Sequence, residues 1–260
     1  MEIAAAGLTS HVKLSSKTIP GRWFRLRARL RAHALEQKYA GDEPPLRSEL
    51  FSADQMQQHG KTLAASHELS LGRAPDQLLP RLAENEEVLL RVRNLLTEAV
   101  QASRRITPAG EWLLDNFYLI EEQIRTAQRH LPKGYSRELP RLLHGPSAGL
   151  PRVYDLALET ISHGDGRVDP ERLSSFVIAY QTVTALKLGE LWALPIMLRL
   201  ALIENLRRVG VRIAADRIDR NHADYWADQM TQTAEQDPKS LILVIADMAR
   251  SSPPMVSSFV

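Results

Sequence analysis

The amino-acid sequence predicts an all-α protein, arranged as a multi-helix bundle or as stacked helical hairpins, with no significant sheet. Three observations lead to this prediction. Apolar residues recur at helical spacing in most segments after residue 45. Residues that favour helix starts and stops separate these segments. The sequence has no Asn-Gly hairpin turn and no sustained alternation of apolar and polar residues, the usual signs of strands.

Composition limits the class of protein to which the chain can belong. Its 260 residues are 44% hydrophobic and 25% charged, which is ordinary for a globular protein with a sizeable core. Because the chain has no cysteine, disulfides and zinc–thiolate sites are excluded. A formal net charge of only +2 predicts no nucleic-acid partner. We also expect no signal peptide in residues 1–20 and no membrane span, since the most apolar run, 191–198, is short.

Residues 1–44 are expected to be a flexible N-terminal segment that contains a basic amphipathic helix over residues 21–40. Arginines attract anionic lipid headgroups, and aromatic side chains can sit at a membrane interface. The helix could therefore contact a membrane or another anionic surface, although a solvated helix face would explain the same residues. The candidate contact residues are Arg22, Trp23, Arg25 and Arg29.

A helical domain is expected over residues 45–252, and capping residues mark its first helices. Ser52 is a good N-cap for the helix that follows it. A second helix is expected over 78–100. Thr107 and Pro108 begin a third, which we expect to continue to residue 131. Its buried face should carry four apolar residues, Leu113, Phe117, Ile120 and Ile124.

The second half of this domain predicts further helices. One covers 153–161, and Asp169 and Pro170 start the next. A mostly apolar central helix is expected next, over 186–209, followed by two more candidate helices, over 212–230 and 239–250. Within the last of these, the apolar run 241–245 could form a strand but fits a short helix.

The last residues, 253–260, look like the start of a further helix. Two prolines are followed by apolar residues, a combination typical of a helix beginning. We expect this helix to be truncated and the natural chain to continue beyond it.

Charged residues on the expected central helix predict ion pairs. Buried charges are costly unless they are paired. We therefore expect a structural network that docks the central helix against residues 118–125, with full exposure to solvent as the alternative. The candidate members are Glu121, Glu122, Arg125, Glu190, Arg199 and Glu204.

No motif points to catalysis. Asp115, Glu121 and Glu122 could form an acid–base pair, but arginines four residues away favour surface ion pairs. His163 and Asp165 offer only two metal ligands, and a polar loop explains them better. We expect no catalytic residue, no metal site and no cofactor in this chain. Three tryptophans could stack on sugar rings, but packing in a helical core is favoured for Trp112, Trp192 and Trp226.

Several motifs resemble the N-terminal region of bacterial cyclic β-1,2-glucan synthases. The most specific are WLLDNFYLIEEQIR at 112–125 and GELWALPIMLRLALIENLRR at 189–208. The whole series runs in the order of that family and occupies 45–64, 78–89, 107–125, 131–142, 149–181 and 186–208.

The resemblance implies a much larger parent protein, a membrane-embedded enzyme that polymerises glucose from UDP-glucose and cyclises the glucan. This chain lacks the membrane and catalytic regions of that family, so no catalytic residue is carried over. The expected function is a non-catalytic helical N-terminal module, present as a fragment or truncated product on the cytoplasmic side of the inner membrane. Its expected partners are the remaining domains of the parent enzyme and the membrane surface. The alternative is an autonomous helical scaffold that binds a protein partner or an anionic membrane.

Overall fold

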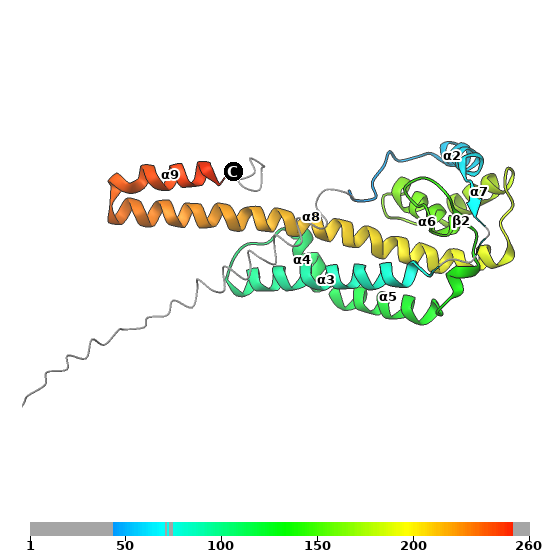
Figure 1. Ribbon diagram of the computed structural model, residues 1–260, viewed down its shortest axis with the longest axis horizontal. Helices are drawn as coiled ribbons and strands as arrows, with labels where there is room; N and C mark the ends of the chain where they lie inside the picture. Colours follow the sequence, from blue (N-terminus) through cyan, green and yellow to red (C-terminus); the bar gives the residue numbers. More distant parts are fainter. Residues whose placement is uncertain (1–43, 71, 73–74, 252–260) are drawn as a thin grey trace, which may run out of the picture.

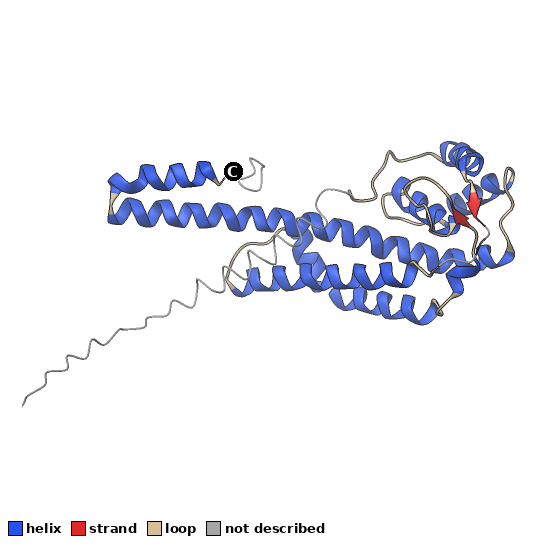
Figure 2. Ribbon diagram, viewed as in Figure 1, coloured by secondary structure: helices blue, strands red, loops and turns tan. Residues whose placement is uncertain are grey.

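The computed structural model describes residues 44–70, 72 and 75–251. The basic helix expected over 21–40 and the further helix expected over 253–260 lie outside the described residues. Within them, helices make up nearly all of the regular structure, and one short sheet is present (Figure 2). The all-α prediction is therefore confirmed.

The longest of the described helices, α8, extends along nearly the full length of the described structure (Figure 1). Its 49 residues span roughly 70 Å at 1.5 Å per residue. Two helices, α3 and α5, lie along one side of it, and α6 packs against its N-terminal part. Helices α2 and α7 pack on each other near α6. α9 folds back along its C-terminal part. The helices are α2 (Ala53–Ser66), α3 (Leu78–Gln101), α4 (Pro108–Asp115), α5 (Phe117–His130), α6 (Arg152–His163), α7 (Pro170–Gln181), α8 (Leu188–Gln236) and α9 (Leu241–Arg250).

The helix starts follow the capping chemistry that the sequence predicts. Ser52 forms a capping box with Gln55 at the start of α2. Thr107 accepts a hydrogen bond from the backbone of Gly110 at the start of α4. Asp169 caps α7 in the same way through the Arg172 backbone. In each case the side-chain oxygen satisfies a backbone N–H that has no partner within the helix.

The continuity of α8 corrects the prediction of two helices over 186–209 and 212–230. Gly210, at the expected break, is buried within one uninterrupted helix. A Cβ atom at Gly210 would lie 3.6–3.7 Å from the side chains of Leu89 and Val92. The glycine therefore sits where α3 packs closely on α8. These are ordinary van der Waals distances, so an alanine would also fit there, and the glycine, which costs about 1 kcal/mol in a helix, does not interrupt α8.

The single helix expected from Thr107 to residue 131 is instead two helices, α4 and α5. Asn116 separates them, with φ −103° and ψ 9°. Its side-chain amide donates to the carbonyl oxygen of Trp112 at 2.8 Å. Asparagine side chains compete in this way for backbone partners and interrupt helices. The four apolar residues expected to be buried, Leu113, Phe117, Ile120 and Ile124, are all buried.

The sheet joins two connecting segments. Strand β1 (Leu69–Ser70) follows α2, and strand β2 (Arg141–Leu142) precedes α6. They pair antiparallel, with Leu69 opposite Leu142. Two short 3-10 helices, η1 (Tyr135–Glu138) and η2 (Pro238–Ser240), complete the regular structure of the described residues. The apolar run at 241–245 is helical, as the sequence favours.

Among the described residues, no helix combines the length and the apolar character needed to cross a bilayer.

Candidate functional site

Glu204, a fully buried carboxylate, lies on α8 among arginines. It accepts hydrogen bonds from Arg81 at 2.7 and 3.0 Å and from the amide of Asn85 at 2.9 Å. Arg207 and Arg208 donate from the same helix at 2.8 and 3.0 Å. Burial alone would raise the pKa of the Glu204 carboxyl, but Arg81 and Arg207 outweigh it and lower the pKa to about 2. The carboxylate is thus held ionised and ties α3 to α8.

A second buried pair fastens α6 to the start of α8. Arg152 donates to both oxygens of Glu190, at 2.6 and 2.7 Å, and both side chains are almost fully buried. Arg152 also donates to the carbonyl oxygen of Ala185 at 2.8 Å. Burial lowers the pKa of the Arg152 guanidinium, but the Glu190 carboxylate more than offsets this, so the pKa is raised. A two-point arginine–carboxylate pair of this kind fixes orientation as well as distance.

The candidate ion-pair residues from the sequence lie in separate places. Glu121 pairs with Arg93 at 3.0 Å and with Arg125 at 4.0 Å on the outer surface of α5 and α3. Glu122 is exposed, and Arg199 is half-buried on α8. Glu204 pairs with arginines of α3 and α8, and Glu190 pairs with Arg152 of α6 and accepts a hydrogen bond from the Lys187 backbone just before α8. The expected docking segment, 118–125, lies on α5.

Sequence reasoning missed the partners of these groups. Arg81 and Arg152 are two of many arginines in the chain, and nothing local distinguishes them. A third buried link was missed as well. His67, at the end of α2, has Tyr180 at 2.8 Å on one ring nitrogen and Asp155 at 3.2 Å on the other. It joins α2, α6 and α7, and Tyr180 is fully buried, so this group is closed to a substrate.

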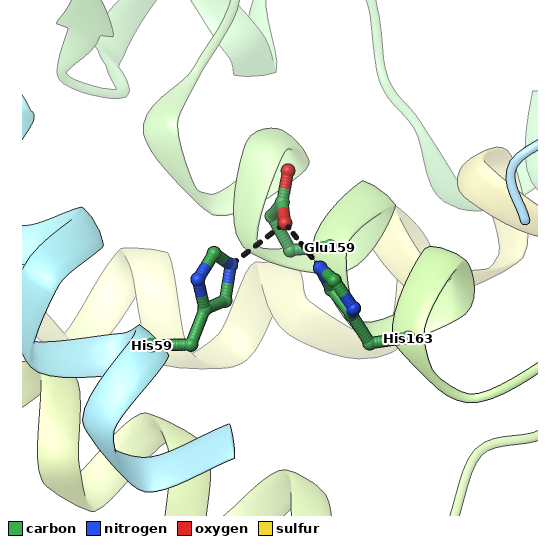
Figure 3. A group of neighbouring side chains, drawn as sticks. All are labelled: His59, Glu159 and His163. Carbon is green, nitrogen blue, oxygen red and sulfur yellow. Dashed lines mark hydrogen bonds and ion pairs between the residues drawn. The ribbon is translucent and has the colours of Figure 1, made fainter. Parts of the chain in front are cut away.

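Three potential metal ligands converge near the outer end of α6 (Figure 3). They are His59 on α2 and Glu159 and His163 on α6, and their ligand atoms all lie within 4.8 Å of one another. His59 Nε2 is 2.7 Å from Glu159 Oε2, and His163 Nε2 is 3.3 Å from the same oxygen. All three residues are half-buried.

Local structure explains why these three side chains meet. Glu159 and His163 are four residues apart, so they project from the same face of α6. His59 reaches them because α2 approaches α7 closely beside it. Next to His59, a Cβ atom on Gly60 would lie only 2.9 Å from the carbonyl oxygen of Phe176. Glycine at position 60 therefore permits the approach that brings His59 to α6.

The sequence singled out His163 as one of two possible ligands. Its expected companion, Asp165, lies in the left-handed backbone region, with φ 51°, and pairs with Arg47 at 3.4 Å. The actual neighbours of His163 are His59, which is distant in the sequence, and Glu159, which lies four residues earlier on α6. The i, i+4 spacing of Glu159 and His163 was the available signal.

The structure contradicts the expected burial of two tryptophans. Trp112 and Trp192 were expected in the core, yet they are 55% and 75% exposed. Their neighbours Leu113 and Ala193 take the buried positions on the same helices. Gly110 lies beside Ile213, so Trp112 is about 20 residues, or roughly 30 Å, along α8 from Trp192. The two rings therefore do not form one sugar-binding platform. Trp226 is half-buried and packs edge-on against Tyr225.

The candidate membrane contacts, Arg22, Trp23, Arg25 and Arg29, lie outside the described residues. Asp115 is exposed at the end of α4, while Glu121 pairs with arginines.

The comparisons with known proteins bear on the family resemblance. No family model matches the chain. Over 210 residues, 80% of its length, the chain is 37% identical to cyclic beta-(1,2)-glucan synthase NdvB of Rhizobium meliloti (strain 1021). The matched segment is only 7% of that protein. The chain is therefore similar, along four-fifths of its length, to a small segment of a cyclic β-1,2-glucan synthase, as its motifs predict.

Proposed function

We propose that this chain is a non-catalytic helical module of a cyclic β-1,2-glucan synthase, in which the polymerising and cyclising chemistry belongs to other domains. The observation that carries the proposal is the similarity along most of the chain to a small segment of such a synthase. A segment that makes up 7% of a large enzyme leaves room for separate catalytic domains.

The environment of the buried charges supports a structural role. A catalytic carboxyl must reach its substrate, and its pKa must suit proton transfer. Glu204 is fully buried among arginines, and its lowered pKa makes it a poor acid or base at neutral pH. Glu190 is equally buried and is held by Arg152. Both pairs connect α8 to neighbouring helices, and they are suited to holding α3 and α6 in fixed positions on the long helix α8.

Exposed apolar side chains on α8 and α9 suggest where other domains would attach. Trp192 lies exposed near the N-terminal end of α8. At the other end, α9 exposes Ile242 and Leu243, which are 66% and 61% accessible. Exposed apolar residues that gather on one element often mark contacts with another domain or chain. The proposed partners are the remaining domains of the synthase, at the cytoplasmic side of the inner membrane.

A segment exchange tests this proposal. The segment of the Rhizobium meliloti protein that matches this chain would be deleted, and cyclic β-1,2-glucan would be measured in cells. We expect the deletion to abolish glucan or to deplete the synthase from membranes. A chimera that carries this chain in place of the segment should restore both. Full glucan synthesis in cells that carry the deletion would show that the segment is dispensable and would overturn the proposal.

A second assay tests the non-catalytic part of the proposal. The purified chain, incubated with labelled UDP-glucose and a divalent cation, should yield no labelled polymer. Membranes that contain the whole synthase serve as the positive control. Formation of polymer by the purified chain would contradict a purely structural role.

The second candidate function is binding to an anionic membrane by an autonomous scaffold. It is favoured by the sequence of residues 21–40, where Arg22, Trp23, Arg25 and Arg29 combine positive charge with an aromatic ring. Co-sedimentation with vesicles of phosphatidylglycerol should weaken when residues 1–40 are removed, and should weaken further at high salt. Equal sedimentation of both chains would exclude this function for the segment.

A further inference from the structure

We propose that His59, Glu159 and His163 bind one divalent first-row transition-metal ion, with Zn²⁺ as the first candidate, and that this ion fastens α2 to α6. The site is independent of the proposed role in glucan synthesis. Figure 3 shows the three side chains, which come from α2 and α6.

The spacing of the ligand atoms suits a small metal ion. Zinc lies about 2.0–2.1 Å from histidine nitrogen and carboxylate oxygen, so tetrahedral ligands stand about 3.3 Å apart. His163 Nε2 and Glu159 Oε2 are 3.3 Å apart. His59 Nε2 lies closer to that oxygen, at 2.7 Å, the distance of a hydrogen bond. A movement of about half an ångström by His59 would lengthen this one distance to that between two ligands of a zinc ion.

The tautomer of His163 directs a ligand atom into the site. Its Nδ1 lies 2.7 Å from the backbone carbonyl oxygen of Glu49, which can only accept a hydrogen bond. Nδ1 must therefore carry a proton. This leaves Nε2 as the ring nitrogen that faces the Glu159 carboxylate, 3.3 Å away, where it can serve as the metal ligand. Histidine ligands in metal sites commonly donate their second ring nitrogen to a carbonyl oxygen in this way.

Aromatic neighbours hold both imidazole rings. Phe51 stacks on His163 with ring centroids 3.8 Å apart and an interplanar angle of 11°. The ring of Phe176 lies nearly parallel to that of His59, with ring centroids 6.2 Å apart. Rings fixed by packing lose little freedom when they bind a metal, which favours binding. The side chains of His59 and Glu159 remain 25% and 29% exposed, so an ion can enter from solvent.

The donor set indicates the class of metal. Two imidazole nitrogens and one carboxylate oxygen suit Zn²⁺ and neighbouring transition ions, whereas Mg²⁺ and Ca²⁺ prefer oxygen ligands alone. Three protein ligands leave a fourth position for water. The ligands come from two helices that are distant in sequence, so the bound ion would cross-link them.

The test is metal binding by the purified, untagged chain after treatment with a chelator. Titration calorimetry with Zn²⁺ should show one site per chain, and Co²⁺ should give the visible absorption of a low-coordinate complex. Mg²⁺ at the same concentration should not compete. The variants His59→Ala and Glu159→Gln should each weaken Zn²⁺ binding by more than about tenfold, since even second-shell changes weaken metal sites by about 10- to 100-fold.

Two features make the result decisive. Glu159→Gln preserves side-chain size, so it separates the loss of a ligand from the loss of packing. His144→Ala is the matched control, because His144 is exposed and lies against Glu68 outside the group. It should bind Zn²⁺ like the parent chain. Absence of Zn²⁺ binding by the parent chain, or equal affinity in Glu159→Gln and His144→Ala, would overturn the proposal.

Discussion

Replacement of Glu204 by glutamine tests the buried charge cluster between α3 and α8. The variant Glu204→Gln keeps the shape of the side chain but leaves Arg81 and Arg207 without their carboxylate partner. The native environment lowers the pKa of Glu204 from 4.5 to about 2. At 1.36 kcal/mol for each unit of pKa, this corresponds to about 3 kcal/mol of stability at neutral pH. Breaking a buried ion pair costs about 3–5 kcal/mol, which agrees.

The assay is urea denaturation followed by circular dichroism at several pH values. Because the folded pKa is depressed, the contribution of Glu204 is fully present above pH 4.5. It is lost as the pH falls toward 2, where the folded carboxyl takes up its proton. The parent chain should therefore lose about 3 kcal/mol more than Glu204→Gln over this range. At neutral pH the variant should be less stable by a similar amount.

Glu121→Gln is the matched control for this experiment. Glu121 also pairs with arginine, but its side chain and that of Arg93 are 37% and 35% exposed. Exposed pairs contribute about 0–1 kcal/mol, so this variant should unfold almost like the parent chain. Equal stability of Glu204→Gln and Glu121→Gln at neutral pH would refute the assignment of Glu204 as a buried anchor.

Three further predictions concern packing, pairing and metal. Gly60→Ala should reduce the free energy of unfolding by about 1–3 kcal/mol in urea denaturation, because its Cβ atom would lie 2.9 Å from the Phe176 carbonyl oxygen. The control Gly189→Ala should not destabilise the chain, because no atom lies within 4 Å of the Cβ atom that it adds. Arg152→Ala should cost about 3–5 kcal/mol in the same measurement, since it leaves Glu190 buried without its charge partner, and a loss below about 1 kcal/mol would contradict the pairing. Zn²⁺ at 100 times its Kd should stabilise the chain by about 2.7 kcal/mol and raise Tm in differential scanning calorimetry by roughly 5–10 °C, whereas an unchanged Tm would contradict a folded-state site.

Much of the fold could be predicted because helix signals are local. Ser52, Thr107 and Asp169 cap helices through bonds to residues only three positions away. Apolar periodicity likewise marks the buried face of α4 and α5 without knowledge of what covers it. The break at Asn116 was missed although its cause is local, a side-chain hydrogen bond to the carbonyl oxygen of Trp112 four residues earlier. The continuity at Gly210 was missed because burial against α3 overrides the weak helix propensity of glycine.

The sequence by itself determined the helical class, most helix starts and the resemblance to glucan synthases. These depend on short-range hydrogen bonds, periodicity and residue order. Only the tertiary structure decided which charges meet, since Arg81 and Glu204 are 123 positions apart. It also decided that Trp112 and Trp192 face outward, and that His59 joins Glu159 and His163. Contacts between distant residues depend on how whole helices pack, and no local pattern encodes that arrangement.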